Sequence, residues 1–298
     1  MKGTSRRQTS LGWNVLRVHY TADPDKDPGT PSGQRWYAHA RQGVKDRDWR
    51  KEYEIDYRAL GGMLVFPEYD PTIHITENHF PLDPGDWTVY QGADPHPRRA
   101  HAFVWLAINR YGDMVVPWSY WPEELNNQRA ENGQARLTIT EYAELLKEVD
   151  SSPLGLAPWL RVMDQAGKNF DADEGVDYFQ KYSDCGITFE PAKKNRDLSG
   201  YNALSEVLRP KPYEDGTKPT LTIWAGCGDN DELAEQIRVL RFREFRGNVP
   251  DKDPPAEPEQ KRKHLIDCLM YILLYGPVFI DRTKRAQQFE PIYPNLGY

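Results

Sequence analysis

The apolar positions of the chain form extended runs in its middle part and helical periods further on. Three runs, 87–93, 101–109 and 113–121, are rich in β-branched and aromatic residues, which favours strands. Between the last two lies Asn109-Arg110-Tyr111-Gly112-Asp113, which has the composition of a turn. The pattern therefore predicts a meander of three strands that begins near Trp87.

Beyond the meander, helical and extended segments alternate. A helix is predicted to begin at Thr138, because Thr138-Ile139-Thr140-Glu141 has the spacing of a capping box and apolar residues then repeat at helical spacing. The other predicted elements are a strand ending at Asp164, a helix at 175–182, a strand at 187–190, a helix at 199–208, a strand at 221–224, a helix from about 229 to 240 and a last helix at 263–274. This order predicts an α/β fold in which helices flank a mixed central sheet.

The first 86 residues read as an N-terminal extension and joining segment, and residues 87–298 as the main domain. The extension contains one short strand-like piece at 13–18, a Pro/Asp/Gly-rich loop at 22–29 and two predicted polar helices over 35–60.

Three aspartates lie at the ends of these apolar segments. Asp94 ends the first strand, Asp164 ends a later strand, and Asp267 lies near the start of the last helix. Carboxylates at such positions stand at the rim of a core, where they can hold Mg²⁺ or Mn²⁺. Phosphodiester hydrolysis by two such ions needs a bridging carboxylate, and Asp94 suits that role. An aspartate on the first strand, on a later strand and on the last helix is the layout of ribonuclease H-like nucleases.

Each aspartate has a structural alternative when taken alone. Asp94 precedes Pro95 and could form a turn, and Asp164 could be an N-cap or loop residue. Asp267 is the most informative, because a carboxylate among so many apolar neighbours is costly unless it is used. His264 lies one turn earlier and could assist the same site. The alternative is that both residues lie on a polar helix face beside lysines.

Composition limits the partners. The 298 residues are 39% apolar and carry a net charge of −7, so a core is possible and general nucleic-acid binding by global charge is not expected. A local basic surface could still contact DNA, and the candidates are Lys193, Lys194, Arg241 and Arg243. Taken alone, Lys193 and Lys194 are better explained by a solvated loop, and Arg241 and Arg243 could instead belong to a helix end whose dipole favours cations. Three cysteines without paired spacing argue against disulfides and zinc, and the longest apolar run is too short to cross a membrane.

The chain resembles the C-terminal nuclease part of the large terminase subunit of tailed bacteriophages. The segments that resemble its three acidic motifs are Gly92-Ala93-Asp94, Val162-Met163-Asp164 and His264-Leu265-Ile266-Asp267. Residues 18–26 and 48–67 resemble the segment that joins motor and nuclease in that family. The order of these motifs and their flanks, more than any single one, carries the resemblance.

The resemblance implies a ribonuclease H-like fold and metal-dependent cleavage of double-stranded phage DNA during genome packaging in the host cytoplasm. It implies that Asp94, Asp164 and Asp267 are catalytic metal ligands for Mg²⁺ or Mn²⁺, with two ions expected, and that His264 assists. Implied partners are a packaging ATPase, the small terminase subunit and the portal. The chain contains no Gly-x-x-x-x-Gly-Lys-Ser/Thr motif, so translocation is not assigned to it. Two alternatives stay open, namely another ribonuclease H-like nuclease of resolvase or transposase type, and a non-catalytic packaging module.

Overall fold

The structure is a computed structural model, and its chain divides into two compact units. One unit is Met1–Val65 with Leu240–Gln260, and the other is Phe66–Val239 with Lys261–Tyr298. The described residues are 3–8, 14–44, 49, 53–54, 63–97, 99–168, 177–193, 198–213, 216–243, 257–260 and 262–281.

The smaller unit is organised around aromatic side chains. Strands β1 (Thr4–Gln8) and β2 (Asn14–Val18) form an antiparallel hairpin, and helix α1 (Pro31–Ala40) follows a short 3-10 turn, η1 (Tyr20–Ala22). Trp49 is only 1% exposed and stacks on Tyr53 at a ring distance of 4.3 Å. Rings from η1 and α1 pack around this pair, so burial of aromatic surface stabilises this part of the unit.

The larger unit is built on a seven-stranded sheet in the order β3-β11-β6-β5-β4-β7-β8. The strands β4, β5 and β6 are antiparallel neighbours, whereas β7 and β8 continue from β4 in parallel, and β11 and β3 continue from β6 in parallel. The bounds are β3 Ile75–Thr76, β4 Trp87–Asp94, β5 Ala102–Asn109, β6 Met114–Tyr120, β7 Leu160–Met163, β8 Glu190–Pro191 and β11 Leu221–Trp224; a separate hairpin joins β9 Lys211–Tyr213 to β10 Gly216–Lys218.

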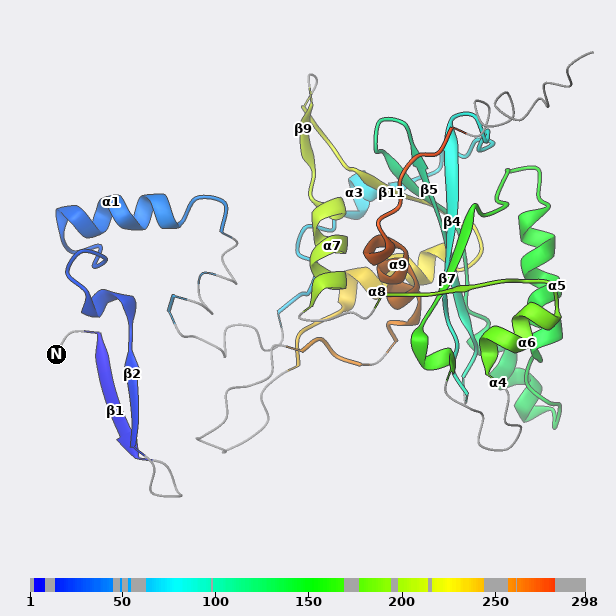
Figure 1. The fold of residues 1–298 in the computed structure, drawn as a ribbon, viewed down its shortest axis with the longest axis horizontal. Coiled ribbons are helices and arrows are strands. Elements are labelled where there is room, and N and C mark those ends of the chain that lie inside the picture. Colours follow the sequence, from blue (N-terminus) through cyan, green and yellow to red (C-terminus); the bar gives the residue numbers. More distant parts are fainter. Residues whose placement is uncertain are drawn as a thin grey trace, which may run out of the picture. The chain divides into compact units, whose positions relative to one another are not determined.

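Helices cover both faces of this sheet. In Figure 1, α7, α8 and α9 lie on one side of β4 and α4, α5 and α6 lie on the other. Their bounds are α3 Pro71–His74, α4 Glu123–Glu131, α5 Ile139–Asp150, α6 Tyr178–Asp184, α7 Ser199–Leu208, α8 Asn230–Val239 and α9 His264–Tyr275. The predicted capping box is present at the start of α5, where Thr138 and Glu141 bond to each other's backbone N–H groups.

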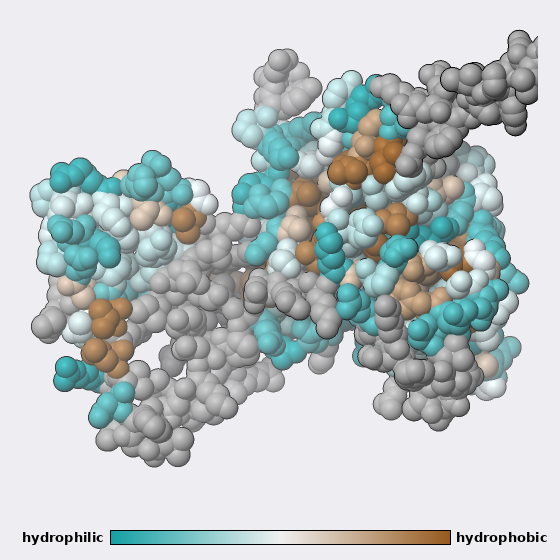
Figure 2. All heavy atoms as spheres, viewed as in Figure 1, coloured by the Kyte–Doolittle hydropathy of each residue, from teal (hydrophilic) through white to brown (hydrophobic). Residues whose placement is uncertain are grey.

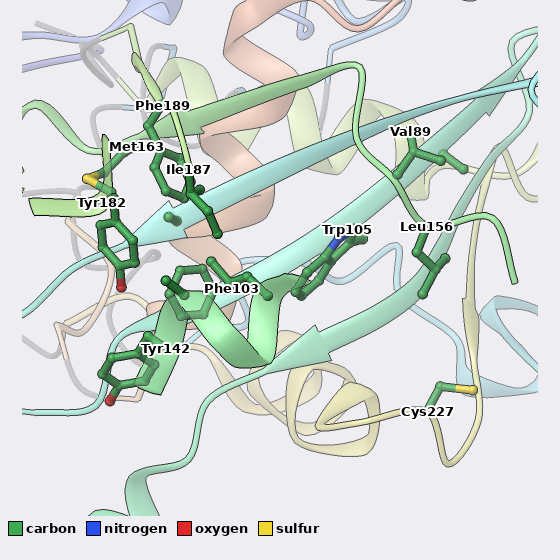
Figure 3. Packing of buried hydrophobic residues seen from close by; sticks show 14 of the residues in the cluster. Val89, Phe103, Trp105, Tyr142, Leu156, Met163, Tyr182, Ile187, Phe189 and Cys227 are labelled. Atoms are coloured by element: carbon green, nitrogen blue, oxygen red, sulfur yellow. The ribbon is translucent and has the colours of Figure 1, made fainter. Parts of the chain in front are cut away.

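The two faces of β4 have different roles. Side chains alternate along a strand, so Val89 and Ala93 point to one face of the sheet. Asp94 points to the opposite face, on which position 92 also lies. Val89 and Ala93 belong to the main core, together with Phe103, Trp105, Tyr142, Leu146, Met163, Tyr182 and Phe189. Figure 3 shows Phe103 from β5 close to Tyr142 from α5 in this core. The opposite face of β4, which carries Asp94, packs against α9.

A buried histidine adds a titratable group to this core. His101 is 5% exposed, stacks on Tyr142 at 4.8 Å, and its Nδ1 lies 2.8 Å from the hydroxyl of Tyr182. Its backbone N–H donates to the hydroxyl of Tyr142. Burial lowers the pKa of His101 from 6.5 to about 3, with a smaller contribution from His96.

The stability of the larger unit should therefore fall as the pH falls below 6.5. In that range the unfolded chain binds a proton at His101 that the folded protein excludes, down to about pH 3. Between pH 7 and pH 5 this loss amounts to about 2 kcal/mol. Urea unfolding should show a smaller loss for His101→Asn, which keeps a hydrogen-bonding group but does not titrate, whereas the exposed-site control His39→Asn should follow the wild type. Equal pH dependence in all three proteins would contradict the assignment.

The structure confirms the predicted α/β order and the mixed sheet flanked by helices. The predicted runs 87–93, 101–109 and 113–121 are β4, β5 and β6 within a residue or two. Helix α4 and the edge strand β3 were not predicted, and the predicted strand 187–190 is only the two-residue β8. The larger unit begins at Phe66, ahead of the predicted domain start at Trp87, because β3 adds to the sheet through β11.

The surface of the larger unit is mixed in polarity. On the face drawn in Figure 2, hydrophobic areas are small and separated by hydrophilic ones. Across the described part of the chain, no helix is both long and apolar enough to cross a membrane.

Candidate functional site

Two of the three aspartates lie side by side at one end of the sheet. Strands β4 and β7 are parallel neighbours, with Ala93 opposite Met163 in the register. The next residues are Asp94 and Asp164, and the backbone N–H of Asp164 donates to the carbonyl of Ala93 at 3.1 Å, which continues the pairing. Residues opposite each other in a parallel pair point to the same face. The sheet therefore brings the two carboxylates together on the face that α9 covers.

Helix α9 reaches this face because Gly92 has no side chain. A Cβ at this position would overlap the carbonyl group of Cys268, so the helix backbone lies directly on the strand. Cys268 also donates its thiol proton to the carbonyl of Ala102 on β5. This close contact places the first turn of α9 beside the end of β4.

His264, the first residue of α9, contacts Asp94. The distance from His264 Nδ1 to Asp94 Oδ2 is 2.6 Å, and both side chains are about 12% exposed. Arg99 Nη1 lies 3.5 Å from His264 Nε2, at the outer limit of a hydrogen bond. A guanidinium only donates, so Nε2 accepts and Nδ1–H donates to Asp94. His264 thus orients the Asp94 carboxylate.

Asp267 has a different partner. Lys263 Nζ lies 2.8 Å from Oδ1 and 2.8 Å from Oδ2 of Asp267, one helical turn apart. The side chains of the pair are 14% and 12% exposed. The ammonium also lies 5.9 Å from the centre of the Tyr201 ring, which comes from α7. Both oxygens of Asp267 are therefore engaged by one cation.

The site combines burial with negative charge. Burial raises the pKa of Asp267 to about 6, with Asp94 adding to the rise and Lys263 opposing it. Burial by itself would lower the pKa of Lys263, but the charges of Asp267 and Tyr201 and the hydrogen bonds to both together outweigh it, so the pKa is raised. Burial and the charges of Asp94, Asp267 and Asp164 together raise the pKa of Tyr271. All three carboxylates thus act on one half-buried phenol of α9.

Helix α8 fixes the start of α9. Lys263 occupies the N-cap position and provides no capping hydrogen bond. Gln236 from α8 instead accepts the backbone N–H of Leu265 at 3.2 Å. Arg262 pairs with Glu232 of the same helix at 2.8 Å. Contacts from α8 therefore stabilise the turn that carries Lys263 and His264.

The carboxylates meet the needs of a hard divalent ion only in part. Asp94 and Asp164 place carboxylate oxygens at one end of the sheet, which suits an ion that keeps several waters. Both Asp267 oxygens accept hydrogen bonds from Lys263, so an ion there would compete with the ammonium for the carboxylate. Within the described residues, no three His, Cys, Asp or Glu side chains are arranged so that they could hold a metal ion.

The predicted DNA contacts fall in different places. Lys193 is exposed in the larger unit, where its ammonium lies 3.3 Å from the carbonyl of Tyr275 at the end of α9. Arg241 and Arg243 belong to the smaller unit, and Arg243 pairs with Glu257 at 3.5 Å. Lys194 lies outside the described residues. Only Lys193 can be related to the aspartates, through its contact with α9.

No protein-family model matches the chain, and no curated protein matches it. Solved structures do. The large terminase of a thermophilic bacteriophage matches 78% of this chain and 52% of its own, at 17% identity and a TM-score of 0.53. The same protein in complex with ADP matches 84% of this chain and 53% of its own, at 15% identity and 0.54. The P22 large terminase nuclease domain matches 72% of this chain and 93% of its own, at 12% identity and 0.49.

The fold is terminase-like. At these identities the likeness concerns the fold alone, and it confirms the predicted ribonuclease H-like α/β class with a mixed central sheet. The chain spans about half the length of the thermophilic phage terminase that it matches.

Sequence reasoning missed Lys263 as a member of the site. The signal was present, because a lysine four residues before Asp267 on a helix is positioned to pair with it. Asp267 is 9% exposed and does not lie on a solvated helix face. The predicted link between His264 and the site is present as a contact to Asp94 on a distant strand. That contact depends on the packing of α9 at Gly92, which no local pattern reveals.

Proposed function

We propose that this chain is a divalent-metal-dependent endonuclease that cuts double-stranded phage DNA during genome packaging. One observation carries the proposal. In a terminase-like fold, Asp94, Asp164 and Asp267 come from three separate elements to the same end of the sheet, where their charges act on one another or on Tyr271. Buried carboxylates gathered in this way destabilise a fold unless a cation uses them.

Each residue has a proposed role. When bound, Mg²⁺ or Mn²⁺ would act as a Lewis acid towards the phosphate and lower the pKa of a bound water. Asp94 and Asp164 would hold the ion at the strand ends. His264 keeps the Asp94 carboxylate oriented through its 2.6 Å contact. Asp267 keeps the ammonium of Lys263 beside the site.

Contacts to DNA are proposed on the rim of the site. Arg99 lies next to His264, and Lys193 lies next to the end of α9. The net charge of −7 repels DNA, so binding relies on such local cations and should weaken strongly with salt. Lys194, Arg241 and Arg243 stay proposed contacts that nothing in the structure tests.

Translocation is not proposed for the residues of this sequence. The large terminase of the thermophilic bacteriophage was solved in complex with ADP and with ATP-gamma-S, and its chain is about twice as long as the part that matches here. This sequence has no P-loop motif. From the resemblance to terminases, we propose a packaging ATPase, the small terminase subunit and the portal as partners in the host cytoplasm.

The test is metal-dependent cutting of plasmid DNA. Purified protein with Mn²⁺ or Mg²⁺ should convert supercoiled plasmid to nicked and linear forms, and a chelator should stop the reaction. Cutting that survives the chelator, or no cutting with either ion, would contradict the proposal. Branched and linear substrates run in parallel would separate a packaging nuclease from a resolvase-type enzyme.

A second candidate, a non-catalytic packaging module, is favoured by one observation. Lys263 already neutralises Asp267 through both oxygens, as in a purely structural ion pair. Titration with Mn²⁺ separates the two functions, because a module that only docks should bind the ion poorly.

A further inference from the structure

We propose that Trp121 and Asp229 are positioning residues for His264. The ring of Trp121 sets the orientation of the His264 ring, and the carboxylate of Asp229 sets the position of Trp121. The inference rests on the proposed nuclease function, and it adds to the site two residues from outside β4, β7 and α9.

Trp121 lies at the end of the sheet that carries Asp94. Strand β6 ends at Tyr120, which pairs with Phe103. The neighbour of Phe103 is Ala102, which pairs with Asp94. Strands β4 and β6 therefore end at the same level, on either side of β5. Trp121 directly follows β6 and so lies beside the candidate site.

The ring of Trp121 contacts the ring of His264. The two ring centres are 5.4 Å apart and the planes are tilted by 42°, which is within the range of favourable aromatic pairs. The 2.6 Å contact with Asp94 fixes only one atom of the imidazole, about which the ring could still turn. The indole restricts this rotation. His96 adds an edge-on ring contact at 5.8 Å, whereas Arg99 lies at the 3.5 Å limit of a hydrogen bond and restrains the ring less.

The carboxylate of Asp229 fixes the backbone of Trp121. Asp229 Oδ2 accepts the backbone N–H of Trp121 at 2.6 Å, and the backbone N–H of Asp229 donates to the carbonyl of Ser119 at 2.9 Å. One residue thus binds the chain at two positions where it leaves β6. Burial raises the pKa of Asp229, and the hydrogen bond from Trp121 opposes that rise. A carboxylate in a poorly solvated place is costly unless it is hydrogen-bonded, so this contact matters to the fold of the loop.

Close packing sets the position of Asp229 itself. The residue directly precedes α8, where an aspartate commonly accepts N–H groups of the first helical turn. Here its Oδ2 reaches across to the chain that leaves β6. A Cβ at the preceding Gly228 would lie 2.1 Å from the carbonyl oxygen of Ser119 and 3.0 Å from the indole of Trp118. The loop before α8 therefore lies directly on β6, and this contact places Asp229 beside Trp121.

The first measurement is the NMR signal of the His264 ring in the full chain with isotope-labelled histidine, recorded without added metal. The signal is identified by its loss in His264→Ala. Trp121→Leu should shift it, because an aromatic ring displaces the resonances of nearby nuclei and leucine has no ring. Trp121→Phe keeps a ring and should shift it less. Asp229→Ala should also shift the signal, and Asp229→Asn, which keeps an acceptor oxygen, should restore it.

The second measurement is plasmid cleavage. Trp121→Leu should lower kcat about tenfold, as expected when a group in a site is misplaced, with little change in KM. Asp229→Ala should lower kcat by a smaller factor. In a chain that already carries His264→Ala, Trp121→Leu should cause no further loss, because the ring that it positions is absent.

The matched controls lie in the same unit. Trp159→Leu removes a ring that is 40% exposed, and Asp70→Ala removes a helix cap, since Asp70 accepts the N–H of Thr72 at 2.9 Å. Neither should change the His264 signal or the cleavage rate.

Two results would overturn the inference and leave the nuclease proposal standing. They are an unshifted His264 signal in Trp121→Leu and Asp229→Ala, and losses of cleavage that add to that of His264→Ala. If Trp121→Leu does not fold, the comparison of Asp229→Ala with Asp229→Asn replaces it, and equal His264 signals in the two would overturn the inference. Absence of cleavage by the wild type would overturn the nuclease proposal, whereas the His264 signal would still show whether Trp121 orients the ring.

Discussion

Asp94→Asn is expected to lower the rate of plasmid cleavage by at least about 1,000-fold, which corresponds to the several kcal/mol that a metal ion contributes to such a reaction. The physical reason is that Asp94 lies between the other groups. It is next to Asp164 in the sheet, it accepts from His264 at 2.6 Å, and its charge acts on Asp267. An asparagine keeps the shape but loses the charge that holds the ion. Relief of repulsion among carboxylates should leave the fold as stable or more stable.

The same assay distinguishes the roles of the neighbours. Asp164→Asn should cause a loss of similar size, and Asp267→Asn should also abolish cleavage because it releases Lys263 from the site. His264→Ala should reduce the rate less, since this ring only orients Asp94. Asp86→Asn is the control, because Asp86 is an exposed partner of Arg110. Near-normal cleavage by Asp94→Asn, with the control also normal, would remove Asp94 from the site.

Gly92→Ala is expected to destabilise the larger unit by about 3 kcal/mol or more. The added Cβ would overlap the carbonyl group of Cys268, and neither β4 nor the backbone of α9 can move aside without disturbing the core. Any shift of α9 would also carry His264 and Lys263 away from their positions, so cleavage should fall together with stability. Urea unfolding and the plasmid assay measure the two effects.

Gly112→Ala is the matched control for this substitution. Gly112 lies in the turn between β5 and β6 with a φ of +81°, and a Cβ there would meet no atom within 4 Å. An alanine should cost only about 1–2 kcal/mol through its left-handed conformation and should not affect cleavage. If Gly92→Ala were no more harmful than Gly112→Ala, the close contact of α9 with β4 would not hold the site together.

The strands and helices could be predicted from the sequence where a local pattern decides them. The meander β4–β6 has dense β-branched and aromatic runs, and α5 carries its capping box. The edge strand β3 could not be predicted, because two residues at Ile75–Thr76 are extended only through pairing with β11. Helix α4 lacks an apolar stripe and begins without a side-chain cap, so it gives little local signal.

In the candidate site, too, some features follow from the local sequence and others from the packing of distant elements. The placement of Asp94 and Asp164 at strand ends and of Asp267 on the last helix follows from the apolar pattern. The pairing of His264 with Asp94 and the seating of Lys263 between Asp267 and Tyr201 depend on which helix packs on which strand. Some hydrogen-bond partners come from other elements, as when Gln236 of α8 accepts the N–H of Leu265 at the start of α9. The local sequence does not predict such partners.

The contact of His264 with Asp94 joins positions 170 residues apart in the chain. During synthesis, β4 leaves the ribosome long before α9 exists, and the carboxylate of Asp94 then has neither its histidine nor the covering helix. The helix is also the element that brings Asp267 and Lys263. The nascent protein therefore has no assembled site until almost all of the residues described have been translated. Production of the protein is in this way separated in time from any reaction at these carboxylates.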